Sequence, residues 1–224
     1  MGLKDWLLRT SSRAGSSNLA GYYADIQRWE DIYNGGGDWR YTRKGGIQGG
    51  TRRLASLGAA RALCGELTRL CFTEGTAMCY SDGDTEKFVN EVLTQSRFTE
   101  RFPVFLEKVF ALGGGVIKVY YDEDTPEGVP GVRVDLVTAD CFLPTEWNSH
   151  SITGGAFASR IMSDGKGFIL AETQQLDGDT LSVENRLMRE DGGRADMSAV
   201  LPGLREKSCI KGLAAPLFVY LSTG

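Results

Sequence analysis

The single histidine, His150, is the first candidate for catalysis in this sequence. A Ser-His-Asp site requires just one histidine, so its isolation does not exclude a hydrolase. However, the sequence contains no Gly-x-Ser-x-Gly elbow and no Cys-His signature that would supply a nucleophile. A surface histidine is the simpler interpretation, and a small hydrolase that uses His150 is kept as an alternative.

The cysteines do not have the spacing of a metal site. They are Cys64, Cys71, Cys79, Cys141 and Cys209. Structural zinc sites take four cysteine or histidine ligands, usually in close pairs, and no two of these cysteines form a Cys-x-x-Cys pair. We therefore predict no metal site and reduced, mostly buried thiols. Cys64 and Cys71 are seven residues apart, which predicts that both face the core from one side of a helix.

Carboxylates and glycines gather at turns rather than in catalytic patterns. The crowded carboxylates are Asp122, Glu123, Asp124 and Glu127 in one segment and Asp177 and Asp179 in another. Aspartate favours turns because its side chain bonds to nearby backbone, so solvated turns are the expectation. The three glycines at 113–115 precede a predicted strand, whereas a phosphate-binding loop follows a strand and opens a helix. We predict no catalytic residue and no cofactor.

One short run interleaves basic and aromatic residues. It contains Trp39, Arg40, Tyr41, Arg43 and Lys44. This composition is typical of loops in which bases stack on aromatic rings and cations hold phosphates, so a nucleic-acid-binding module is a second alternative. An interface or packing loop is the simpler interpretation, because such binding uses an extended groove. The net charge of −4 provides no overall attraction to nucleic acid.

The N-terminal half of the chain has helical periodicity. Residues 1–20 combine a short amphipathic stretch with a Ser/Gly-rich linker, which predicts a flexible segment. No stretch of the chain approaches the ~20 apolar residues of a membrane span. Apolar residues at helical spacing predict helices at 22–33, from 51 to about 71, from 84 or 85, and at 102–112. Thr51 is the expected N-cap of the second helix, and Asp84 or Thr85 that of the third.

The C-terminal half has the composition of β-strands. Strands are predicted at 116–121, 132–137, 157–162, 168–176, 180–188 and 216–221, with a bend at 141–144 and an irregular stretch at 192–205. The Asp-Gly-Asp sequence at 177–179 predicts a hairpin turn. Helices followed by antiparallel strands indicate an α+β fold, in which N-terminal helices (21–112) pack on a C-terminal antiparallel β-sheet (113–224) within one domain.

Several segments, taken in order, resemble one family of viral proteins. They are WEDIYNG from residue 29, the long helix from 53 that leads to a Cys-x-Glu element, FLEKVFALGGGVIKVYYD from 105, VDLVTADCFLPTEW from 134, and PLFVY from 216. Each segment alone is weak, but their shared order and spacing resemble the N-terminal part of tailed-phage portal proteins of the SPP1-like type. The resemblance covers residues 29–220.

The resemblance implies a structural role rather than an enzymatic one. Portal subunits form a homo-oligomeric ring, typically a dodecamer, at one capsid vertex, and double-stranded DNA enters and leaves through its channel. The implied partners are the capsid protein, the terminase motor and head-completion proteins. The implied location is the virion, with the host cytoplasm during assembly. The portal has no catalytic site, because the motor hydrolyses ATP.

Members of this family continue beyond the PLFVY-like segment into a clip, a stem and a crown. The resemblance therefore implies that this chain is the outer, wing-like part of a portal subunit, truncated before the clip and stem. Since the stem lines the channel, we expect that this chain alone does not line a DNA channel.

Overall fold

The structure is a computed structural model, and it describes residues 17–36, 42–44, 51–53, 57–73, 76, 78, 80, 82–122, 125–127, 129, 131–149 and 151–223. Its N-terminal elements are α2 (Ser17–Tyr33), β1 (Thr42–Lys44), β2 (Thr51–Arg53), α3 (Ala59–Cys71), α4 (Gly83–Gln95) and α5 (Phe98–Leu112). The elements that follow are β3 (Gly114–Tyr121), β4 (Val132–Thr138), η1 (Ala139–Cys141), β5 (Phe142–Trp147), β6 (Ile152–Ser163), β7 (Lys166–Asp177), β8 (Thr180–Arg189), α6 (Met197–Val200), β9 (Lys207–Lys211) and β10 (Phe218–Ser222).

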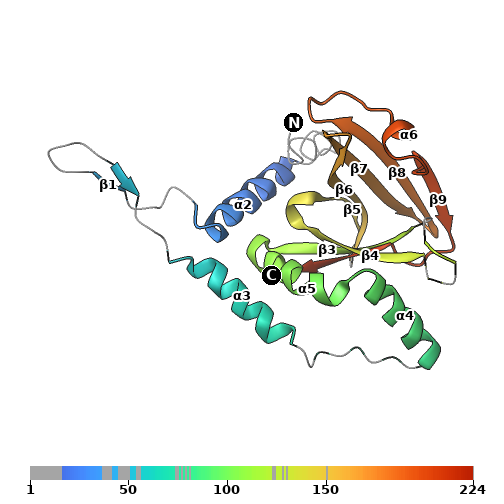
Figure 1. Cartoon of the computed structure of the whole chain (residues 1–224), viewed down its shortest axis with the longest axis horizontal. Helices are drawn as coiled ribbons and strands as arrows, with labels where there is room; N and C mark the ends of the chain where they lie inside the picture. The colour runs from blue at the N-terminus through green and yellow to red at the C-terminus, as the bar shows by residue number, and fades with distance from the viewer. Residues whose placement is uncertain are drawn as a thin grey trace.

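The described strands form two antiparallel sheets and a separate two-stranded ribbon. One sheet has the order β10-β3-β4, the other has the order β5-β6-β7-β8-β9, and β1 pairs with β2. Helices α2 to α5 precede both sheets in the chain, as Figure 1 shows. The predicted α+β class, with N-terminal helices and a C-terminal antiparallel β region, is therefore confirmed.

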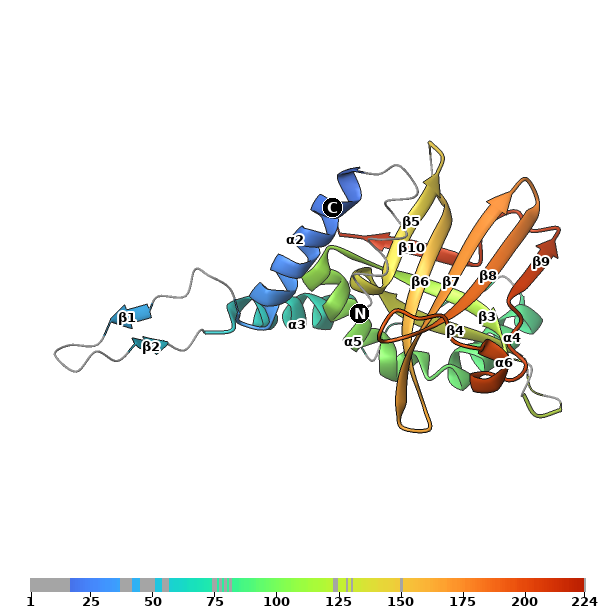
Figure 2. The same cartoon turned by 90° about the horizontal axis from the view of Figure 1, so that it is seen from above.

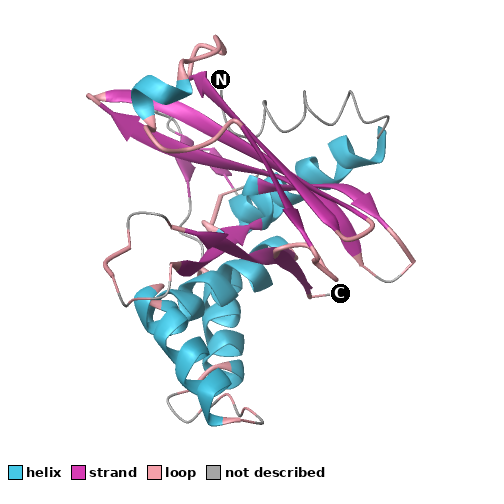
Figure 3. Ribbon diagram, turned by 90° about the vertical axis from the view of Figure 1, so that its right-hand side faces the viewer, coloured by secondary structure: helices cyan, strands magenta, loops and turns pink. Residues whose placement is uncertain are grey.

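The two sheets pack face to face, and α4 and α5 lie on the side of the three-stranded sheet that is turned away from the five-stranded sheet (Figure 3). Val116 of the three-stranded sheet meets Phe142 and Phe157 of the five-stranded sheet in a buried cluster. The opposite face of the three-stranded sheet buries Val134 against α4 and α5. Ile26 of α2 lies in a third buried cluster with alanines of the five-stranded sheet. Each sheet thus has a helix on the face that is turned away from the other sheet.

Helix α5 turns sharply into β3 at the three glycines. Gly113 ends the helix with a φ of 80°, a left-handed conformation that glycine adopts without steric cost. A Cβ on Gly115 would lie 2.7 Å from the Phe105 ring, so the strand leaves close to the helix surface. The prediction that these glycines form a helix-to-strand joint rather than a phosphate loop agrees with this geometry.

Two hairpin turns set the register of the five-stranded sheet. The predicted turn after β7 is confirmed, since Asp177 pairs with Thr180 and Gly178 has a positive φ. The turn between β6 and β7 uses Asp164 and Gly165, both with positive φ. Two consecutive positive values are typical of the type I′ turn that matches the twist of paired strands.

Several predicted boundaries are wrong. Thr51 is not a helix N-cap, because it belongs to β2, and α3 begins at Ala59 after the left-handed Gly58. The N-cap of α4 is Asp82, whose carboxylate accepts the Thr85 backbone N–H at 2.8 Å. Helix α2 extends back into the predicted linker, and strand β5 replaces the predicted bend from Phe142 onward. Strand β9 and the short helix α6 were not predicted.

Candidate functional site

The predicted basic and aromatic run lies only partly within the described residues. Arg43 and Lys44 belong to strand β1, so the interpretation of this run as a loop is wrong for these two residues. Trp39, Arg40 and Tyr41 lie outside the described residues. The structure therefore brings two of the five predicted contact residues together and leaves the other three untested.

Strand β1 pairs with a second basic strand that was expected to be helical. Arg43 lies opposite Arg52, and Thr42 lies opposite Arg53. Residues 39–53 contain five basic residues and no acidic residue. In Figures 1 and 2 this ribbon lies apart from the other described elements, between α2 and α3 in the chain. The ribbon is a concentrated positive charge on a chain whose net charge is negative.

Helix α3 presents an apolar face that is not covered by the described residues. Leu63, Leu67 and Leu70 are all exposed, and Leu63 is 62% exposed. Leu57, just before the helix, is also exposed. Within the helix the buried residues are Cys64 and Thr68 alone. A chain of 224 residues can bury a large core, so a run of exposed leucines on one helix indicates a binding surface rather than a lack of core.

The exposed and buried faces of α3 are adjacent. Successive residues of an α-helix are separated by about 100° around its axis, so Leu63, Leu67 and Leu70 share one face. Cys64 and Thr68 point about 100° away from Leu63 and Leu67, respectively. The apolar arc of α3 is thus wider than the part that the described residues cover, and the leucine face (Leu63, Leu67 and Leu70) extends beyond the contact with α5.

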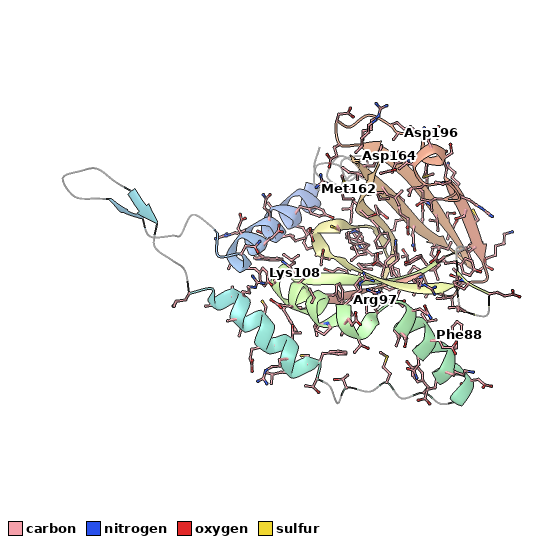
Figure 4. All side chains as sticks on the ribbon, in the orientation of Figure 1. Phe88, Arg97, Lys108, Met162, Asp164 and Asp196 are labelled. Carbon is pink, nitrogen blue, oxygen red and sulfur yellow. The ribbon has the colours of Figure 1, made fainter. Side chains whose placement is uncertain are left out.

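A polar seam holds α3 against α5 and the end of α2. The Tyr33 hydroxyl donates to a carboxylate oxygen of Glu107 at 2.5 Å, and the Arg61 guanidinium lies 3.9 Å from the same oxygen. The Lys108 ammonium lies 4.2 Å from the centre of the Tyr33 ring. Figure 4 labels Lys108 where α5 faces the end of α2. These contacts fix which side of α3 is turned to α5 and α2 and which side the described part of the chain leaves exposed.

The cysteines of α3 correct one prediction from the sequence. Cys64 faces the interior, and burial, with a smaller contribution from Glu107, raises the pKa of its thiol. Cys71 is exposed, so the prediction that both cysteines face the core is wrong for Cys71. Cys209 is also exposed and Cys141 is half-buried, so the prediction of mostly buried thiols fails within the described residues. Cys71 follows Leu67 by four residues and therefore borders the leucine face.

Helix α4 projects from the molecule with an acidic, partly apolar end. Every residue from Gly83 to Phe88 is exposed, whereas Val92 near the other end is buried against β4 and α5. The exposed end carries Asp84 and Glu86, and the Phe88 side chain is 48% exposed. In Figures 1 and 2, α3 and α4 lie on either side of α5. Figure 4 labels Phe88 on α4, toward the end of the helix that is exposed.

The structure adds no support for catalysis. His150 lies outside the described residues. The described parts of the chain contain no group of three His, Cys, Asp or Glu side chains that could hold a metal ion. Asp122 lies 3.9 Å from Arg133 in an ion pair, and Asp177 and Asp179 flank an exposed hairpin turn. The described carboxylates of these turns thus have the structural environment that the sequence predicts.

Comparison with known proteins does not identify the chain. No protein-family model matches the sequence, and a search of curated proteins found no match. Among the described residues, no helix is long and apolar enough to cross a membrane. The functional assignment therefore depends on the surfaces described above and on the sequence resemblance.

The sequence pattern predicts the helix that carries the leucine face but does not indicate what covers that face. Its residues were part of the predicted helical pattern, together with Cys64 and Cys71. The arginine pairing of the ribbon was missed, because Arg52 and Arg53 were assigned to the start of that helix.

Proposed function

We propose that this chain is a structural subunit of a phage portal ring, or head-tail connector, and contributes its outer, wing-like part. DNA is packaged and ejected through such a ring, and the capsid protein, terminase and head-completion proteins are its partners. The resemblance of residues 29–220 to portal proteins motivates the proposal. The observation that carries it furthest is the uncovered leucine face of α3, because a ring subunit requires surfaces for its neighbours.

The stability of α3 is the physical reason to expect a neighbour. An isolated helix of fewer than ~12–15 residues is marginal in water, and packing of an apolar face supplies most of its stability. Helix α3 has 13 residues and buries two of them. Covering a leucine side chain fully contributes about 2 kcal/mol, so a partner on Leu63, Leu67 and Leu70 would stabilise the helix substantially.

The arrangement of α3 and α4 favours a contact between unlike surfaces. The two helices flank α5, and α3 presents the leucine face while α4 presents the exposed Phe88. When α3 of one copy meets α4 of the next, the apolar side chains of the two helices meet. Such a contact is heterologous, because it joins two different surfaces of neighbouring copies. It produces a ring when the rotation from one copy to the next brings the last copy back to the first.

Photo-cross-linking tests this arrangement. A benzophenone amino acid placed at Leu67 is expected to cross-link to residues 83–95 of a second copy, as mapped by mass spectrometry after isotope mixing. The same group at Met162, which is exposed on the five-stranded sheet, serves as the control and is expected to give no such product. Cross-links from Leu67 that map elsewhere, or that form within one copy alone, would contradict the α3–α4 contact.

A further inference from the structure

The edge strands of the two described sheets are β4, β5, β9 and β10, and β4 is closed to a further strand. The Val134 backbone N–H of β4 donates to the Ser96 hydroxyl at 2.8 Å. The Leu136 backbone N–H donates to the Asp135 carboxylate at 2.9 Å. An added strand would need these two donors, and side chains already occupy them.

Both edges of the five-stranded sheet are closed by other means. Strand β5 contains Pro144, and its register against β6 shifts between Pro144 and Glu146. Strand β9 has Lys207 and Lys211 at its two ends. Proline, irregular register and lysine are common features that keep an edge strand from pairing with another chain.

Strand β10 has none of these features. Its sequence from Phe218 to Ser222 contains no charged residue and no proline. Phe218 is buried, whereas Val219 is 62% exposed and Tyr220 is half-buried. Val219 lies opposite Ile117 of β3, on the face of the sheet that is turned to α4 and α5. The accessible part of β10 therefore begins at Val219 and combines a strand edge with an exposed apolar side chain.

The pairing of β10 with β3 determines which of its backbone groups point outward. The Leu217 carbonyl accepts the Val119 N–H of β3 at 2.8 Å. Residues of an antiparallel pair alternate between those that bond to the partner strand and those that do not, so Val219 bonds to β3 and Tyr220 points away from it. No described residue forms a hydrogen bond with the backbone N–H or C=O of Tyr220.

We propose that β10 binds an extended, uncharged strand of another polypeptide, which pairs with the backbone of Tyr220 and covers Val219. An open strand edge recognises an extended chain through main-chain hydrogen bonds, and alternate side chains give the specificity. The lack of charge on β10 favours an apolar strand, because a charged side chain beside Val219 would lose water without gaining a partner.

A second copy of this chain does not provide that strand. Its β4, β5 and β9 edges are closed in the same way, so its own β10 would be the remaining choice. Pairing of β10 with β10 is isologous, whereas the proposed subunit contact is heterologous and relates neighbours by the rotation of a ring. In this respect alone the inference rests on the proposed function.

Amide hydrogen exchange of the full chain, measured residue by residue by NMR, tests this edge. The probe is a blocked peptide of alternating threonine and valine, flanked by serines. At about ten times its dissociation constant, the peptide is expected to slow exchange of the Tyr220 N–H about tenfold. Exchange of the Val219 N–H, which bonds to β3, should stay unchanged. A peptide with the same side chains and every backbone nitrogen methylated should have no effect.

Variants of exposed residues provide the matched comparison. Val219→Lys is expected to weaken peptide binding about fivefold, because an apolar contact between neighbouring strands is lost. Met162→Lys, on the internal strand β6 at the same 62% exposure, should leave binding unchanged. Equal weakening in both variants would overturn the proposal, as would no slowing of exchange at about 1 mM peptide. Slow exchange of the Tyr220 N–H without peptide would also overturn it, because the edge would then already be covered.

Sedimentation of the same samples separates this inference from the proposed function. Val219→Lys is expected to self-associate like the unmodified chain, and Leu63→Glu/Leu67→Glu/Leu70→Glu is expected to keep its peptide binding. Loss of self-association in Val219→Lys would show that a second copy occupies β10, which overturns the proposal. If the unmodified chain does not self-associate, the proposed subunit contact fails, while slowed exchange at Tyr220 still supports the strand edge.

Discussion

Leu63 and Cys64 are consecutive residues of α3 with opposite environments: Leu63 is 62% exposed, and Cys64 is buried on the side that packs against α5. Glu107 of α5 adds to the effect of burial in raising the pKa of the Cys64 thiol. This contrast divides the helix into one face that belongs to the fold and one that is available to a partner.

Thiol labelling is expected to detect both faces. The thiolate is the reactive form, so the raised pKa and burial of Cys64 predict labelling about tenfold or more slower than for the exposed Cys71 and Cys209. Concentrating the protein should favour self-association, which slows the labelling of Cys71 because this residue borders the leucine face. Cys209 on β9 should stay as reactive as in dilute protein. Peptide mapping of maleimide adducts measures each site. Equal protection of Cys71 and Cys209 would argue against a contact at α3.

Ser96 is expected to be important for docking α4 and α5 on the three-stranded sheet. Its buried hydroxyl donates to the Val92 carbonyl at 2.7 Å and accepts the Val134 backbone N–H at 2.8 Å. Ser96→Ala leaves the Val134 N–H unpaired, which should lower the free energy of unfolding by about 1–3 kcal/mol. Urea denaturation measures this, with the exposed Ser159→Ala as control. A Ser96 variant as stable as the control would show that the bond contributes little.

Alkaline pH is expected to release α2. Burial and the hydrogen bond to Glu107 raise the pKa of Tyr33 to about 12, and burial raises the pKa values of Tyr22 and Tyr23 still further. A pKa raised above the unfolded value of ~10 means that the neutral phenol stabilises the fold. This stabilisation is complete below pH 10 and is lost as the pH rises toward 12.

The measurement follows tyrosinate absorbance and circular dichroism over the same pH range. Folded protein should ionise these tyrosines late, together with the loss of helix signal. Tyr33→Phe should reduce the loss of helix signal between pH 10 and 12 by the part that comes from ionisation of Tyr33. Normal titration of all tyrosines with intact helix signal would contradict the buried environment of α2.

Much of the C-terminal half was predictable, because its signals are local. The turn at Asp177 and the β-branched composition of β3 and β4 fix strand positions through short-range sterics and hydrogen bonding. The order of helices followed by antiparallel strands was sufficient for the fold class. The division into two facing sheets was not predictable, because it depends on contacts such as Val116 with Phe157 between distant segments.

The candidate surfaces were less predictable for two different reasons. An apolar helix face has the same pattern whether its own chain or another molecule covers it, so the spacing of Leu63 and Leu67 predicts a helix but not what covers them. The ribbon was missed because arginine and lysine have no strong strand preference, and the pairing of Arg43 with Arg52 is a tertiary property. The residues Trp39, Arg40 and Tyr41 lie outside the described residues and stay a prediction.

Sedimentation velocity over a range of protein concentrations tests the central claim most directly. The account predicts that the chain associates beyond a monomer as concentration rises, and that Leu63→Glu/Leu67→Glu/Leu70→Glu keeps it monomeric with a normal circular dichroism spectrum. Met162→Glu, at a position with the same 62% exposure as Leu63, should associate like the unmodified chain. A chain that stays monomeric at every concentration, or a leucine variant that associates normally, would contradict the account.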